Sequence, residues 1–188
     1  MDELVNLIAA AYDPKTSHAF AQFVPSDADL RDLAEVGKDV LQNFPSKPGA
    51  CGPMSAMYLA RWEMQPRPRM FMVAGELYAD GTRVFGHDNM GSTINEEIRK
   101  SNLSWDGHFW LVFGLYTVDV SIFRTAYSGY SPPALAAHVH RVCGKQKGLL
   151  IANKTGLDEV GFRYVPHAIL SSDQVDGYCH GARALFET

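Results

Sequence analysis

The sequence predicts a single α+β domain in which helices come first and an antiparallel sheet follows. Apolar residues recur at helical spacing in the first third of the chain, and short β-rich runs separated by turn residues follow. No linker, internal repeat or low-complexity segment divides the 188 residues. A chain of this length can bury one substantial core, so we expect residues 1–188 to form one domain.

The first two helices are predicted from apolar spacing and from their end signals. Apolar residues at helical intervals predict a helix over residues 2–12, and Pro14 breaks it. Ser26 precedes acidic residues and predicts the N-cap of a second helix, which continues through Val40.

The third predicted helix begins near Cys51. Residues 45–49 contain two prolines and a glycine, which indicates a loop before it. Pro53 is suited to a first helical turn, and Pro66 ends the helical spacing that follows. We therefore expect Cys51 at or just before a helix N-terminus.

The middle of the chain predicts strands. A run over 70–78, a turn and a return over 83–86 indicate one hairpin. Runs over 108–113 and 116–121 indicate a second hairpin around Gly114. The remaining expectations are a helix over 94–100, a helix over 134–142, strands over 149–152 and 161–165, and an undecided segment over 176–186.

Composition narrows the classes of function. Hydrophobic residues make up 46% and charged residues 20%, as in a globular domain, and the net charge of −4 gives no basic field for nucleic acid. No stretch is long and apolar enough to span a bilayer. The N-terminus carries two acids where a signal peptide has a basic region, so we expect a cytoplasmic protein. Cys51, Cys143 and Cys179 are then expected to be reduced thiols.

Cys51, His108 and Asp119 supply a thiol, a base and an orienting carboxylate in that order. A helix N-terminus and a nearby imidazole both favour the thiolate, which is the nucleophilic form. If residues 108–121 form a tight hairpin, its ends become cross-strand neighbours, and Asp119 comes within reach of His108. We expect the carboxylate to accept a hydrogen bond from Nδ1–H and fix the tautomer.

This arrangement resembles the transglutaminase-like branch of the papain-like cysteine hydrolases. The resemblance is carried by Gly49-Ala50-Cys51-Gly52-Pro53, by His108-Phe109-Trp110-Leu111-Val112 and by Thr117-Val118-Asp119. These motifs span roughly residues 40 to 125, and the arylamine N-acetyltransferases share their order. The family's cysteine is often followed by a small or polar residue and then an aromatic one, whereas here Gly52-Pro53 follows.

The resemblance implies a papain-like fold and thiol-dependent hydrolysis of an amide bond through an acyl-thioenzyme, as in a peptidase, amidase or deamidase. It implies Cys51, His108 and Asp119 as the catalytic triad of a thiol protease or related hydrolase. Gln42 or Asn43 is a candidate side-chain donor to the oxyanion. Trp105 and Trp110 are candidate cleft-lining residues. The substrate would be a peptide, a protein or a small amide.

Other interpretations stay open. The same site could transfer an acyl group to an amine, or the fold could be a non-catalytic binding module. Each triad residue alone has a structural explanation, since a free cysteine is most often a small buried hydrophobe. His138, His140, Cys143, Cys179 and His180 match no zinc-binding spacing, so no metal or other cofactor is expected. We expect no nucleic-acid or membrane partner, and the oligomeric state is undetermined by the sequence.

Overall fold

Strand β1 (Phe71–Ala79) is the centre of the antiparallel sheet in this computed structural model, which describes residues 2–45, 47, 49–99 and 105–186. The other strands in those residues are β2 (Thr82–Phe85), β3 (His108–Phe113), β4 (Tyr116–Asp119), β5 (Leu150–Ala152) and β6 (Phe162–Ile169). The helices are α1 (Asp2–Ala11), α2 (Pro14–Gln22), α3 (Asp27–Asn43), α4 (Cys51–Glu63), α5 (Met90–Arg99), α6 (Ile122–Ala126), α7 (Pro133–Val142), α8 (Lys154–Glu159) and α9 (Ser172–Phe186).

Two neighbours of β1 share one of its edges. Strand β6 pairs with Val73–Ala79. Strand β3 pairs with Phe71–Gly75 and β2 with Leu77–Ala79. Both stretches overlap the β6 pairing, so β2 and β3 must lie end to end along the opposite edge. The sheet continues from β3 to β4 and β5. The junction of β2 and β3 lies at Gly75, the cross-strand partner of His108.

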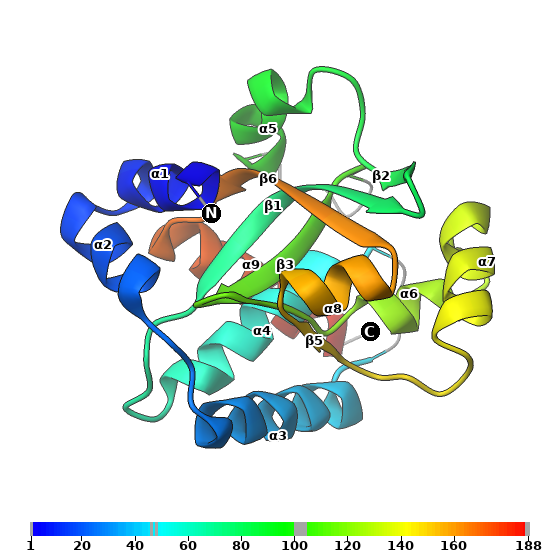
Figure 1. Cartoon of the computed structure of the whole chain (residues 1–188), viewed down its shortest axis with the longest axis horizontal. Coiled ribbons are helices and arrows are strands. Elements are labelled where there is room, and N and C mark those ends of the chain that lie inside the picture. The colour runs from blue at the N-terminus through cyan, green and yellow to red at the C-terminus, as the bar shows by residue number, and fades with distance from the viewer. Residues whose placement is uncertain (1, 46, 48, 100–104, 187–188) are drawn as a thin grey trace.

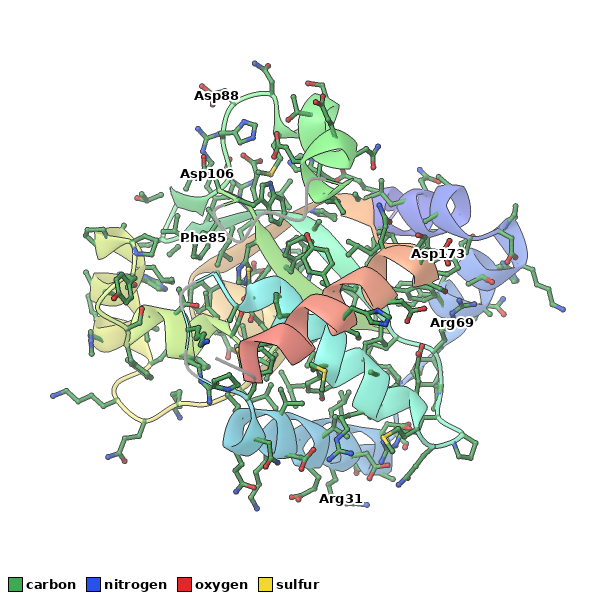
Figure 2. The ribbon with its side chains drawn as sticks, turned by 180° about the vertical axis from the view of Figure 1, so that it is seen from behind. Arg31, Arg69, Phe85, Asp88, Asp106 and Asp173 are labelled. Carbon is green, nitrogen blue, oxygen red and sulfur yellow. The ribbon has the colours of Figure 1, made fainter. Side chains whose placement is uncertain are left out.

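Helices cover both faces of the sheet (Figure 1). Alternate residues of β1 point to opposite faces, and nearly all of them are buried. Met72 and Ala74 belong to the largest apolar cluster, which is completed by α3, α4, α5 and α9. Seen from behind, α9 crosses in front of α4 (Figure 2). Phe71 and Val73 pack on the other side with residues of α1 and α2. Further along β1, Leu77 packs with α6, α7 and α8.

The structure confirms the α+β class and most of the predicted elements. Ser26 caps α3 through its side chain, as predicted, and Asp29 completes a capping box. The thiol residue begins α4, and the hairpin of β3 and β4 turns at Gly114 with a φ of 54°. The predicted loop over 45–49 includes Ser46 and Pro48, which lie outside the described residues, as does the predicted helix position Lys100.

Four helices were not predicted. Pro14 ends the first helix but also begins α2, because proline fits a first turn and Asp13 caps it by accepting from Thr16 N. Helices α6 and α8 have 5 and 6 residues, too few to show a helical period. Helix α9 resolves the undecided C-terminal segment. Among the described residues, none of the helices combines the length and the apolar character needed to cross a membrane.

Candidate active site

Cys51 is the first residue of α4, at the end of that helix where backbone N–H groups have no partners within the helix. The preceding residue, Ala50, contributes no side-chain cap. The thiol residue is half-buried, whereas Gly52 and Pro53 after it are buried. A Cβ at Gly52 would lie 2.7 Å from Tyr178 of α9, so this glycine lets the start of α4 approach α9 closely. Gly52 therefore has a packing role at the start of α4.

His108 and Asp119 lie at the open ends of β3 and β4. The hairpin register pairs Leu111 with Val118, and continuing that register places Asp119 opposite Trp110. His108 is two residues before Trp110 on the same face of β3, so its side chain is a diagonal neighbour of Asp119. His108 Nε2 lies 2.5 Å from Asp119 Oδ2. The predicted neighbourhood of the two side chains is confirmed, but the predicted ring nitrogen was wrong. Asp119 binds Nε2, which leaves Nδ1 as the free nitrogen.

Asp119 is completely buried and is held by five hydrogen bonds. Its Oδ1 accepts from the backbone N–H groups of Ser121 and Ile122, both at 2.9 Å, and from the Ser121 hydroxyl at 3.0 Å. Its Oδ2 accepts from the Tyr164 hydroxyl at 2.9 Å as well as from His108. A buried carboxylate with this many donors is fixed in place and stays ionised.

The two buried groups shift each other's ionisation in opposite directions. Burial by itself would lower the pKa of His108, but the charge and hydrogen bond of Asp119, with a further contribution from Cys51, raise that pKa above its ordinary value of 6.5. Burial also opposes ionisation of Asp119, but the His108 charge and the hydrogen bonds hold its pKa below its ordinary range. The pair therefore consists of an imidazolium and a carboxylate at neutral pH.

The second nitrogen of His108, Nδ1, makes no hydrogen bond to Asp119, and Cys51 is a neighbour of the ring. Nδ1 is buried and has no partner with hydrogen-bond geometry in the part of the chain that the structure describes. Cys51 nevertheless lies close enough to raise the pKa of His108 through hydrogen bonding and charge. The charge of Cys51 also adds to the effect of burial in raising the pKa of Tyr178. Cys51 is therefore near both the His108 imidazole and Tyr178 of α9.

A groove of about 430 Å³ opens onto Cys51. Phe85, from the end of β2, lines it and stacks on the His108 ring with 5.0 Å between centroids and 13° between planes. Trp105 lines the groove too, as predicted for one of the two tryptophans. Phe85 is among the residues marked in Figure 2. The sulfur can therefore be reached by a small substrate although its base is buried.

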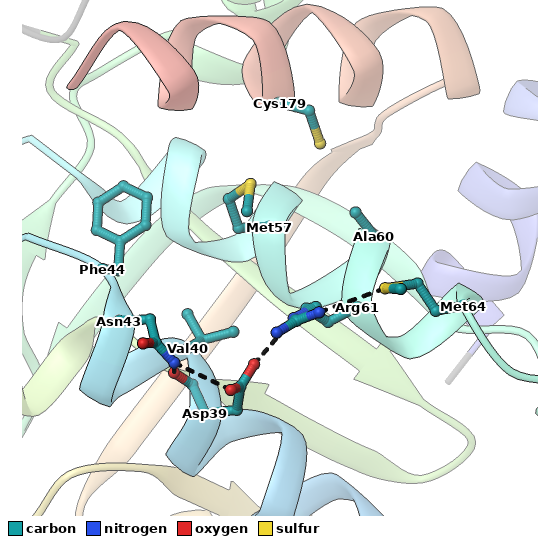
Figure 3. A pocket seen from close by; sticks show the side chains of 9 residues that line it. All are labelled: Asp39, Val40, Asn43, Phe44, Met57, Ala60, Arg61, Met64 and Cys179. Atoms are coloured by element: carbon teal, nitrogen blue, oxygen red, sulfur yellow. Dashed lines mark hydrogen bonds and ion pairs between the residues drawn. The ribbon is translucent and has the colours of Figure 1, made fainter. Parts of the chain in front are cut away.

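The other predicted site residues lie elsewhere. Trp110 is buried among Phe71 and its neighbours and faces Tyr164, with 5.1 Å between ring centroids. Asn43 lines a different hollow and donates to the Asp39 side chain at 3.0 Å (Figure 3). Gln42 lines a third hollow beside Leu149. The structure therefore brings neither amide to the sulfur and does not support them as oxyanion donors.

Two site residues had no signal in the sequence. Tyr164 lies 45 positions after Asp119 and reaches it only because β6 is beside β1. Phe85 stacks on His108 because β2 and β3 meet end to end. Both contacts depend on strand pairings that local spacing does not encode.

Among the described residues no disulfide joins Cys51, Cys143 or Cys179, and no group of three or more His, Cys, Asp or Glu could hold a metal ion. Comparison with protein-family models, with curated proteins and with solved structures finds no match to this chain.

Proposed function

We propose that this protein is a cysteine hydrolase with a papain-like, transglutaminase-like fold that cleaves an amide bond through an acyl-thioenzyme. The observation that carries the proposal is the setting of His108. One of its nitrogens is bound by a buried carboxylate, and the other is buried, unpaired and beside a half-exposed thiol on a groove. A thiol, a base and a group that orients the base are the parts that nucleophilic catalysis requires.

In the first half-reaction the Cys51 thiolate attacks the carbonyl carbon, a C–S bond forms and an electron pair moves to oxygen. The uncapped backbone N–H groups at the start of α4 are the donors available to this oxyanion. The C–N bond then breaks as His108 gives the Nδ1 proton to the leaving amine. The raised pKa of His108 keeps that proton on the ring at neutral pH.

The second half-reaction needs the same histidine as a base. Cys51 contributes to the raised pKa of His108, and an acylated sulfur carries no charge, so acylation lowers the pKa of the imidazole. The neutral ring takes a proton from water at Nδ1, the water oxygen attacks the acyl carbon, and the C–S bond breaks. A carboxylic acid leaves, and the thiolate and imidazolium are restored.

Alkylation tests whether Cys51 is activated. We expect iodoacetamide to label Cys51 at a lower pH than Cys143, whose pKa is raised by burial, as measured by mass spectrometry of the peptides. His108→Ala should slow labelling of Cys51 at neutral pH by at least about tenfold, because the variant lacks the imidazolium that favours the thiolate.

His138→Gln is the matched control, because His138 is another buried histidine whose Nε2 meets the Val160 carbonyl oxygen, at 2.7 Å. It should leave the labelling rate unchanged. Labelling of Cys51 and Cys143 at one common pH would overturn the proposal.

An activated ester tests whether Cys51 is acylated and the acyl-enzyme then hydrolysed. With p-nitrophenyl acetate we expect a burst of nitrophenolate, an acetyl adduct on Cys51 and then release of acetate. Adding an amine separates hydrolysis from acyl transfer, because capture of the acetyl group by the amine in preference to water would indicate a transferase.

A further inference from the structure

The groove at Cys51 has aromatic walls. Phe85, Trp105 and Tyr130 line it, and Phe85 already covers one face of the His108 ring. Tyr130 is 78% exposed, a high value for a large aromatic side chain outside an interface. Aromatic faces gathered around a reactive atom are suited to hold a flat or apolar group of a substrate.

Trp105 is fixed in its place by several neighbours. Its Nε1 donates to Glu97 Oε2 at 2.6 Å, and its ring lies against Phe109 with 4.3 Å between centroids. A Cβ at Gly107 would lie 2.1 Å from the indole, so only glycine leaves room for the ring at this point. The indole is therefore a preorganised wall, which lowers the cost of binding against it.

Glu97 lies on α5 and is in turn held by His87, which precedes that helix. His87 Nε2 lies 3.0 Å from Glu97 Oε1, so each carboxylate oxygen of Glu97 has its own partner. Burial opposes ionisation of Glu97, but its hydrogen bonds and the nearby His87 hold its pKa below the ordinary range. Glu97 is thus a charged acceptor that orients the indole, although it does not itself line the groove.

The charge of the groove also affects which substrate groups can enter it. Among the described residues that line it, Lys47 and Arg124 are basic and none is Asp or Glu, although acids outnumber bases in the chain by 21 to 17. The guanidinium of Arg124 is fixed by the carbonyl oxygens of Leu41 and Phe44 at 2.5 and 2.7 Å. A positive group entering the groove meets like charge and no carboxylate.

We infer that the substrate carries an aromatic or flat apolar group next to the scissile carbonyl, that this group lies against Trp105, and that a basic group is disfavoured at the same position. This inference rests on the proposed function, because it takes Cys51 as the reacting residue. Trp105 is then the specificity-determining residue, and Glu97 is its positioning residue.

Three haloacetamides test the inference on the full chain: iodoacetamide, N-benzyl-iodoacetamide and N-(4-aminobutyl)-iodoacetamide. We expect the benzyl reagent to alkylate Cys51 about fivefold faster than iodoacetamide, with saturation, because one aromatic contact stabilises by about 1 kcal/mol. The aminobutyl reagent should be slower than the benzyl one. Cys143 in the same sample is the internal control and should show no preference.

Variants test whether the preference for the benzyl reagent depends on Trp105 and Glu97. Trp105→Ala should remove the benzyl preference through weaker binding of the reagent, so that Cys51 reacts with the benzyl reagent and with iodoacetamide at similar rates. Glu97→Leu should weaken the preference in the same way, while Glu97→Gln should retain it, because the amide oxygen can still accept from the indole. The rescue by Gln separates positioning of Trp105 from a general loss of structure.

Different results would overturn the proposed function and this inference. If Cys51 reacts at lower pH than Cys143 but shows no benzyl preference, or if Trp105→Ala and Glu97→Leu both keep the preference, this inference fails and the proposed function stands. If no reagent distinguishes Cys51 from Cys143, the proposed function fails, and this inference fails with it.

Discussion

Oxygen Oδ2 of Asp119 is shared by two donors, His108 Nε2 and the Tyr164 hydroxyl. Each donor stabilises the carboxylate and reduces its attraction for the other. Burial and the charge of Asp119 raise the pKa of Tyr164 well above its ordinary value, so the phenol stays a neutral donor. Tyr164 therefore sets how tightly Asp119 holds the imidazolium.

Replacing this phenol should separate the two half-reactions. In Tyr164→Phe the less solvated carboxylate holds the imidazolium more tightly, so the pKa of His108 rises further. We expect the rate of Cys51 alkylation below neutral pH to stay the same, because His108 is already protonated there. Release of acetate from the acetyl-enzyme should become several-fold slower, because the base is harder to deprotonate. Stopped-flow and mass spectrometry measure the two rates.

Tyr12→Phe is the matched control, since the Tyr12 hydroxyl donates to the Leu170 carbonyl oxygen at 2.8 Å. It removes one comparable hydrogen bond and should change neither rate. Equal losses of both rates in Tyr164→Phe would mean that the tyrosine has only a structural role.

At the scale of residues, the sequence contained enough to place His108 beside Asp119. His108 and Asp119 are joined by a short hairpin, so their proximity follows from local register. The ring nitrogen that binds Asp119 could not be predicted, because it depends on the side-chain rotation of His108, which local sequence does not encode. Gln42 and Asn43 were candidate oxyanion donors from their position upstream of the loop before Cys51, but α3 carries both to other surfaces.

At the scale of elements, the end-to-end junction of β2 and β3 depends on one glycine of β1. Gly75 faces His108 across the sheet and lies between β3 and β6. A Cβ there would lie 2.0 Å from the Val165 carbonyl oxygen and 2.9 Å from Trp110. The carbonyl belongs to the backbone of β6, so it can move only if the strand pairing changes.

Gly75→Ala should therefore destabilise the protein by about 3 kcal/mol, the upper end of what overpacking costs. Urea unfolding followed by circular dichroism measures the loss. Gly177→Ala is the control, because a Cβ at this position of α9 meets no atom within 4 Å. It should raise stability by up to about 1 kcal/mol, since alanine favours the helix. Similar stability of Gly75→Ala and the parent protein would contradict this account of the junction.

Elements were predictable where their signals were local. The capping box at Ser26 and the turn at Gly114 lie within a few residues of what they define. Helix α2 was missed because a proline was interpreted only as a breaker, although Asp13 gave a capping signal beside it. Helices α6 and α8 are single turns held by tertiary contacts, which short sequence windows do not reveal.

At the scale of the molecule, the candidate site lies where separate layers meet. Helix α4 supplies the thiol from the face that α9 covers, the β3–β4 hairpin supplies the histidine and the carboxylate, and β6 adds Tyr164. The C-terminal helix reaches the thiol through Tyr178. These long-range placements, which the sequence did not predict, make the ionisation of the site a property of the whole fold.

The stability of the protein should consequently depend on pH through His108. Asp119, with Cys51, overcomes the opposing effect of burial and raises the pKa of His108 from 6.5 to about 10. Between these values the folded state binds more protons than the unfolded state, so the free energy of unfolding falls as pH rises. Asp119 has a lowered pKa, so its contribution is present above its unfolded value of 3.8 and is lost on acidification through the folded value. Stability from this pair is therefore greatest in the mildly acidic range between 3.8 and 6.5.

The effect of His108 is isolated by comparing the parent protein with His108→Gln in urea unfolding from about pH 7 to about pH 9. One proton held only in the folded state gives a slope of up to about −1.4 kcal/mol per pH unit, and this part of the slope should vanish in the variant. His18→Gln, an exposed histidine of α2, should keep the parent slope. Parallel curves for the parent and His108→Gln would show that His108 binds its proton equally in the folded and unfolded chain, and the imidazolium–carboxylate pair would have to be abandoned.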